Sequence, residues 1–172
     1  LSLRRQRQMC IRDSLNASLK LAMGEYVLFA GQEIIPELDA LFQMVKAITE
    51  KKADMIYTDE DEISADGKHY SEPEFKPDFN LFRLRENNYI GQFWAIRKEI
   101  LEQAGKFDPE YDGAQDYDML LRCSEQAENI VHVPKILCHS MKAENLITEE
   151  QEKKNWEAGR KALEEHYRRA EV

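Results

Sequence analysis

The sequence predicts an α/β fold, in which helices alternate with strands and pack on a sheet. Apolar residues recur at helical spacing over several segments of about ten residues. Between these segments lie short runs rich in β-branched and aromatic residues, which are typical of buried strands. The chain has 172 residues. Because domains contain roughly 100–200 residues, one hydrophobic core is expected.

The first predicted helix covers residues 16–23, with Asn16 as its N-cap and Gly24 as its stop. Residues 25–30 (EYVLFA) form the strand that follows. A second helix opens with Pro36 in its first turn, where proline is favoured. Its apolar side chains fall at helical spacing and are expected to form one buried face: Leu38, Leu41, Phe42, Val45 and Ile48.

The next strand is predicted at residues 53–57 (ADMIY), after which the periodicity is lost. Turn-forming and proline residues between 58 and 85 predict a long loop, which within a domain is usually functional or disordered. A strand, two helices, a strand and a terminal helix follow, at residues 88–97, 98–104, 115–125, 130–138 and 148–170.

The composition excludes several classes of protein. The chain has 33 acidic and 24 basic residues and a net charge of -9, which argues against binding to nucleic acid. No apolar run approaches the roughly 18 residues that a membrane-spanning helix needs. The three cysteines, at positions 10, 123 and 138, form no CxxC pair, so a reducing compartment is favoured.

Residues 1–14 (LSLRRQRQMCIRDS) differ from the rest of the chain, because they hold four Arg and one Asp in an acidic protein. A basic nucleic-acid arm or a targeting peptide would explain them, but the apolar segment of a targeting peptide does not follow. The string RQMCIRDS also resembles a translated sequencing-adapter remnant at the end of a metagenomic fragment. We therefore expect residues 1–14 to be a non-native or sequencing-derived segment, and the natural N-terminal part to be missing.

Four consecutive carboxylates, Asp59 to Glu62, come directly after the predicted strand at residues 53–57. In open α/β sheets, ligands bind at the carboxyl ends of the strands. Clustered carboxylate oxygens suit a hard divalent cation or a hydroxyl-rich ligand, and a solvated acidic loop explains the same residues. A metal-dependent phosphohydrolase built on this run is the weakest hypothesis, since no accompanying His/Asp pattern is present.

The segment Gln115 to Asp118 (QDYD) opens a predicted helix after a turn that contains Gly113. The helix dipole stabilises a carboxylate there, so capping alone explains the residues. The alternative is a general base presented at the edge of a pocket. His139, which follows a strand, is either a metal ligand or a packed histidine, and His132 has no partner that the sequence identifies.

Taken together and in order, four stretches resemble the family 2 glycosyltransferases of the GT-A fold, particularly bacterial enzymes that build surface polysaccharides. The stretches are NASLKLAMGEYVLF, ADMIYTDEDEISADGKHYSEPEFKPDFN, NNYIGQFWAIRKEILEQAGKFDPEYDGAQDYDMLLR and IVHVPKILCHS. Residues 15–141 resemble the C-terminal part of such a domain, and residues 142–172 resemble the helical extension that often follows it. The resemblance implies a Rossmann-like three-layer α/β/α sandwich with a mixed sheet that lacks its first strands.

The resemblance also implies an activity. A hexose or deoxyhexose would be transferred, with inversion, from a nucleotide-sugar donor to a hydroxyl of a glycan or lipid-linked acceptor in cell-wall or surface-polysaccharide synthesis. Such an enzyme works in the cytoplasm, in some cases as a peripheral protein at the inner face of the cell membrane. Asp116 is the implied base, Gln115 and Asp118 are implied substrate contacts, and Asp59 and Asp61 would lie near the donor and acceptor pocket.

The metal motif departs from the family pattern. After GEYVLF the family has Asp-x-Asp, whereas this chain has Gly31 and Glu33 at the two Asp positions. The resemblance implies a divalent metal, Mn or Mg, held by Glu33 and His139 in a site that the change at Gly31 weakens. The alternative function is a catalytically inactive glycan-binding or scaffolding domain of a larger glycosyltransferase. The altered motif favours that alternative, and the retained Gln115-Asp116 pair opposes it.

The strands that hold the nucleotide in this family would precede residue 15. We therefore expect the polypeptide alone to bind a donor weakly. A sheet without its first strands also exposes an edge and apolar surface, so marginal stability or association is expected.

Overall fold

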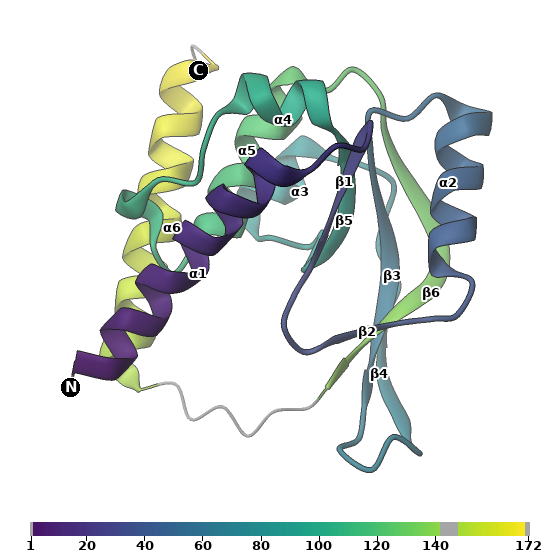
Figure 1. The fold of residues 1–172 in the computed structure, drawn as a ribbon, viewed down its shortest axis with the longest axis horizontal. Coiled ribbons are helices and arrows are strands. Elements are labelled where there is room, and N and C mark those ends of the chain that lie inside the picture. The colour runs from purple at the N-terminus through teal and green to yellow at the C-terminus, as the bar shows by residue number, and fades with distance from the viewer. Residues whose placement is uncertain (1, 142–147, 171–172) are drawn as a thin grey trace. The chain divides into compact units, whose positions relative to one another are not determined.

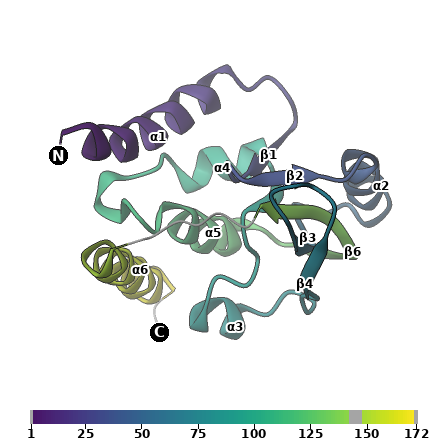
Figure 2. The same cartoon turned by 90° about the horizontal axis from the view of Figure 1, so that it is seen from below.

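The computed structural model describes residues 2–141 and 148–170, and for residues 2–11 it describes the backbone alone. The chain divides into two compact units. The first unit comprises Leu1–Glu25, Lys98–Gln126 and Leu146–Val172, and the second comprises Tyr26–Arg97 and Ala127–Asn145. Figures 1 and 2 show the helices and strands of both units.

The second unit is built on a mixed sheet of six strands in the order β1-β5-β3-β6-β2, with β4 paired to β3. β3 and β6 run parallel, and the other strand pairs are antiparallel. The predicted α/β fold with a mixed sheet is therefore confirmed. The strands are β1 (Tyr26–Ala30), β2 (Ile34–Pro36), β3 (Met55–Ile63), β4 (Tyr70–Glu74), β5 (Phe93–Arg97) and β6 (Ile130–Met141).

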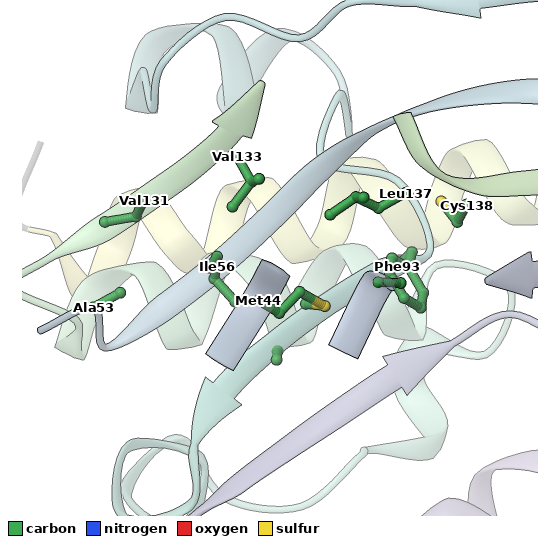
Figure 3. Close-up of a cluster of buried hydrophobic side chains, with 10 residues drawn as sticks. Met44, Ala53, Ile56, Phe93, Val131, Val133, Leu137 and Cys138 are labelled. Carbon is green, nitrogen blue, oxygen red and sulfur yellow. The ribbon is translucent and has the colours of Figure 1, made fainter. Parts of the chain in front are cut away.

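The helix α2 (Ala40–Lys51) packs on one face of this sheet and closes the core of the second unit. Met44 of α2 lies among side chains from three strands, as Figure 3 shows. Successive strand residues point to opposite faces of a sheet, so Ile56 of β3 and Phe93 of β5 reach this core while their neighbours point away. The remaining buried residues of the cluster are Ala40, Ala53, Ala95, Val131, Val133, Leu137 and Cys138.

The face of α2 that meets the sheet is not the predicted one. The helix begins at Ala40, and Pro36 ends β2 instead of opening the helix. Ala40 and Met44 are buried, and Ile48 packs against the core. Apolar residues occupy both sides of α2, so their spacing alone could not identify the buried side. The residues predicted to be buried that lie outward are Leu38, Leu41, Phe42 and Val45, with exposed fractions of 104%, 61%, 67% and 59%.

The predicted loop over residues 58–85 is also wrong. β3 continues through Asp59 to Ile63, so the acidic run lies inside a strand. Residues 55–57 of this strand pair with β5 and residues 60–63 pair with β4, while β6 runs along its other edge. The same stretch also contains α3 (Leu81–Glu86).

The first unit is helical. It contains α1 (Ser2–Leu21), α4 (Lys98–Ala104), the short 3-10 helix η1 (Pro109–Tyr111), α5 (Gln115–Gln126) and α6 (Glu149–Arg169). The predicted helices at residues 98–104, 115–125 and 148–170 are confirmed within one residue at each end. The first helix is longer than predicted, and Asn16 is not its cap. The side-chain amide of Asn16 instead bonds both backbone polar groups of Phe107, at 3.0 Å each.

Candidate active site

In the second unit, Asp59 and Asp61 each pair with a histidine of β6. Nε2 of His132 lies 2.7 Å from Oδ1 of Asp59, and Nδ1 of His139 contacts Oδ1 of Asp61. The parallel register of the two strands places Asp61 directly opposite His139. All four side chains are buried. The neighbouring strand therefore supplies the partners that allow carboxylates inside β3.

An irregular stretch of β6 sets the spacing of the two Asp–His pairs. Thr58 lies opposite Val133, but the next residue, Asp59, lies opposite Ile136. The extra residues form a bulge that contains Pro134, where a missing N–H costs no ladder hydrogen bond. Carboxylates two positions apart on β3 can therefore meet histidines seven positions apart on β6.

Lys76 provides a third partner for the acidic run. Its Nζ lies 3.0 Å from Oε2 of Glu60 and donates to the carbonyl of Ile90 at 2.7 Å. Its backbone N–H donates to Oδ1 of Asp59 at 2.8 Å. The Lys76 side chain is 1% exposed, so it is a buried cation held by a carboxylate. Burial raises the pKa of the Glu60 carboxyl, with Lys76 opposing the rise and Glu74 adding to it.

Both ring nitrogens of His139 are occupied. Besides the contact to Asp61, Nε2 lies 3.0 Å from Oε1 of Glu37, and the ring of Tyr70 packs edge-on with a centroid distance of 4.8 Å. Glu33, the predicted metal ligand, is tied to β6 through its backbone, because its carbonyl accepts from the N–H of Met141 at 2.8 Å. Beside Asp61, the carboxylate that contacts His139 is that of Glu37, which the sequence did not single out. The antiparallel pairing of β2 with β6, invisible in the residue spacing, brings it there.

Gly31 follows β1 at the first position of the altered metal motif. Its N–H donates to the carbonyl of Gln92 at 3.0 Å, and a Cβ added to Gly31 would overlap Oε1 of Gln92. The Gln92 amide therefore fills the space that a side chain at position 31 would need. Since Gly31 has no side-chain oxygen and the nitrogens of His139 are engaged, these residues do not fit a divalent cation as they are arranged. Throughout the described part of the chain, no three His, Cys, Asp or Glu side chains are grouped to hold a metal ion.

A recess of about 350 Å³ opens beside this part of the sheet. Carboxylates dominate its lining, and such oxygens accept hydrogen bonds from hydroxyl groups. The recess is lined by Glu60, Asp61, Glu62, Glu72, Pro73, Glu74 and Ser140.

In the first unit, Asp116 lies in the first turn of α5 with its side chain partly buried. Burial raises the pKa of its carboxyl above the ordinary range of an aspartate. Gln115 supports the turn before the helix, because its Oε1 accepts from the N–H of Gly113 at 2.8 Å. Asp116 is therefore a carboxylate whose local backbone is fixed and whose proton affinity is increased.

Asp118 lies deeper, with an exposed fraction of 1%. Its Oδ2 accepts from Nε of Arg122 at 3.0 Å, and Nη2 of the same guanidinium donates to the carbonyl of Lys106 at 3.1 Å. Nη1 of Arg122 contacts the carbonyl of Ala104. These contacts of Arg122 tie α5 to the last residue of α4 and to the segment that follows it.

The functional roles of seven residues stay predictions: Glu33, Asp59, Asp61, Gln115, Asp116, Asp118 and His139.

No family model matches the chain. An uncharacterised protein of Sinorhizobium fredii, y4gI, is 35% identical over 159 residues, which cover 90% of this chain and 17% of that protein. The O-antigen biosynthesis protein RfbC of Myxococcus xanthus is 36% identical over 126 residues, which cover 73% of this chain and 10% of that protein. The chain thus spans less than a fifth of the length of either relative.

Crystal structures of TarS from S. aureus have the same fold. The complex of TarS 1-349 with UDP-GlcNAc gives a TM-score of 0.63 at 20% identity, covering 86% of this chain and 44% of that chain. The complex with UDP gives 0.61 at 18% identity, covering 86% and 43%. The predicted GT-A fold is therefore confirmed, and the chain is similar in sequence to a bacterial O-antigen biosynthesis protein. Within the described residues, no helix has the length and apolarity to cross a membrane.

Proposed function

We propose that the chain is part of an inverting glycosyltransferase that moves a sugar from a nucleotide-sugar donor to an acceptor hydroxyl in the synthesis of a bacterial surface polysaccharide. One observation carries this proposal: sequence similarity to an O-antigen biosynthesis protein coincides with the fold of TarS, which was crystallised with UDP and UDP-GlcNAc. A uridine diphosphate sugar is therefore the first donor to test. We also propose that the enzyme belongs to glycosyltransferase family 2 and that the sugar it transfers is a hexose or a deoxyhexose.

Asp116 is the proposed general base. Its carboxylate would take the proton of the acceptor hydroxyl while the hydroxyl oxygen attacks the anomeric carbon of the donor sugar. The bond from that carbon to the diphosphate breaks on the opposite side, so the configuration inverts. The raised pKa of Asp116 supports this role, because a base works best when its pKa approaches the working pH.

The acceptor is proposed to be a glycan or a lipid-linked sugar, and the reaction to take place in the cytoplasm or at the inner face of the membrane. The carboxylate-lined recess supports a hydroxyl-rich ligand in the second unit, since its oxygens are hydrogen-bond acceptors.

A catalytically inactive glycan-binding or scaffolding domain is the second candidate. The packing of Gln92 over Gly31 favours it, because this position contributes no carboxylate. The two candidates differ in one property. A glycosyltransferase consumes a nucleotide-sugar donor, whereas a glycan-binding domain binds glycan and leaves the nucleotide sugar intact.

The test is a transfer assay on the purified protein with a panel of nucleotide sugars, UDP-GlcNAc among them, and oligosaccharide or lipid-linked acceptors. Release of the nucleoside diphosphate and the mass of the acceptor product are measured together. The proposal expects acceptor-dependent release and a product larger by one sugar. Glycan binding without any release would instead establish the second candidate.

A further inference from the structure

We infer that this chain takes no divalent cation at its altered Asp-x-Asp position or on Asp59 to Asp61 of its acidic strand, because Lys76, His132 and His139 already occupy these three carboxylates. The expectation that a nucleotide sugar binds without a metal rests on the proposed function. The expectation that no cation binds is independent of it, because it follows from the packing of the second unit alone.

The altered motif begins at Gly31, directly after β1. Mg²⁺ and Mn²⁺ prefer oxygen ligands held in near-octahedral geometry. Gly31 offers no side-chain oxygen, and the exposed side chain of Gln92 covers it. A carboxylate could stand at position 31 only after the Gln92 side chain turned away. The position is therefore filled by an amide of the protein.

Three carboxylates of the acidic strand already have buried partners. Oδ1 of Asp59 receives both His132 and the backbone N–H of Lys76, at 2.7 and 2.8 Å. Oε2 of Glu60 receives the Lys76 ammonium at 3.0 Å. Asp61 receives His139. These partners are buried, so a cation would have to displace them from a desolvated site and leave them unpaired, which is costly.

His139 meets a carboxylate at each of its two ring nitrogens. A metal-bound histidine commonly donates its second ring N–H to a carboxylate, so one carboxylate neighbour would be compatible with metal binding. Here Asp61 meets Nδ1 and Glu37 meets Nε2. Neither nitrogen can offer its lone pair to a metal until one of these two contacts is broken. His139 therefore acts as a bridge between β3 and the segment after β2.

Residues of other segments thus pair with three of the four carboxylates of this strand. The fourth carboxylate, Glu62, lines the recess described above. Lys76, His132 and His139 are positioning residues in this account, since they hold carboxylates of the acidic strand.

The direct experiment is a Mn²⁺ titration of the purified protein, followed by the electron paramagnetic resonance signal of free Mn²⁺. Glu33→Gln is the matched variant, because Glu33 is the carboxylate that the motif retains and its partial exposure allows a neutral substitution. We expect no saturable site, and the same weak residual binding in both proteins. One equivalent of Mn²⁺ bound saturably by the parent, and weakened about tenfold or more in Glu33→Gln, would overturn the inference.

A second arm separates this inference from the proposed function. Binding of UDP-GlcNAc and of the other nucleotide sugars of the panel is measured by isothermal titration calorimetry, once with EDTA and once with Mn²⁺. Equal binding under both conditions supports the inference, and binding that requires Mn²⁺ overturns it while the proposed function stands. Failure of every nucleotide sugar to bind under both conditions counts against the proposed function, and the Mn²⁺ titration then decides the inference by itself.

Discussion

Replacing Gly113 with alanine should destabilise the first unit strongly, because two separate costs meet at this residue. Its φ is +102°, a backbone conformation that L side chains rarely adopt. A Cβ at this position would overlap Oδ1 of Asn155 and lie 3.3 Å from its Cα, so the backbone of α6 must shift. The turn that would be strained is the one that leads into α5 and Asp116.

The magnitude follows from these two costs. Left-handed backbone costs a non-glycine residue about 1–2 kcal/mol, and forcing an extra methyl group into packed structure costs about 1–3 kcal/mol. Gly113→Ala should therefore lower the free energy of unfolding by about 2–5 kcal/mol, a large part of the roughly 5–15 kcal/mol of a typical domain.

Two other glycines separate backbone strain from steric overlap. Gly67 has φ +70° and nothing within 4 Å of an added Cβ, so Gly67→Ala should cost about 1 kcal/mol from strain alone. Gly159 lies inside α6, and an added Cβ would lie 3.8 Å from Cβ of Ala114, an ordinary contact. Gly159→Ala should stabilise the protein by about 0.5–1 kcal/mol, because alanine favours the helix.

The assay is urea denaturation of the three variants and the parent, followed by far-UV circular dichroism. The predicted order of stability is Gly159→Ala, parent, Gly67→Ala and Gly113→Ala, from highest to lowest. If Gly113→Ala unfolds within about 0.5 kcal/mol of the parent, the close approach of α6 to this turn is refuted.

Three further predictions test the core and the buried ionisable groups. Met44→Ala should cost about 2–5 kcal/mol in urea denaturation, whereas Phe42→Ala should stay within about 0.5 kcal/mol, and equal losses would contradict the orientation of α2. Burial raises the thiol pKa of Cys123 and Cys138 to about 12, so peptide mapping should find both unlabelled by iodoacetamide at mildly alkaline pH in the folded protein and labelled in urea. Because burial raises the pKa of Asp116 above its unfolded value, ionising it opposes folding at neutral pH. Asp116→Asn should therefore be at least as stable as the parent at neutral pH, with the advantage shrinking as the pH falls through the folded-state pKa; a less stable variant would argue against the burial.

Local signals were enough to predict several elements. The helices α4, α5 and α6 begin or end at residues that favour a helix end by themselves. Gly105, with φ +91°, follows the last residue of α4, and Thr148 is the N-cap of α6, where its side chain accepts a hydrogen bond from the N–H of Gln151. The strand β1 is likewise marked by its own aromatic and β-branched residues.

Non-local partners account for what the sequence could not predict. Three carboxylates of the acidic run can lie inside β3 because His132, His139 and Lys76 pair with them from other segments, and nothing in the spacing of Asp59 to Glu62 reveals these partners. The choice of Glu37 as the partner of His139 depends on the register of β2 against β6. The sequence shows which residues of this region could bind a ligand or a metal, whereas the topology of the sheet decides which of them pair with one another.

The central claim is that Asp116 is the base of a sugar transfer. The most direct measurement compares the parent, Asp116→Asn and Glu149→Gln in the same transfer assay, with donor binding followed by saturation-transfer NMR. Glu149 is the matched control, because it is an exposed carboxylate in the first turn of another helix of the same unit. The account predicts that Asp116→Asn binds the donor but loses transfer, while Glu149→Gln transfers as the parent does. Transfer by Asp116→Asn at the rate of the parent would contradict it.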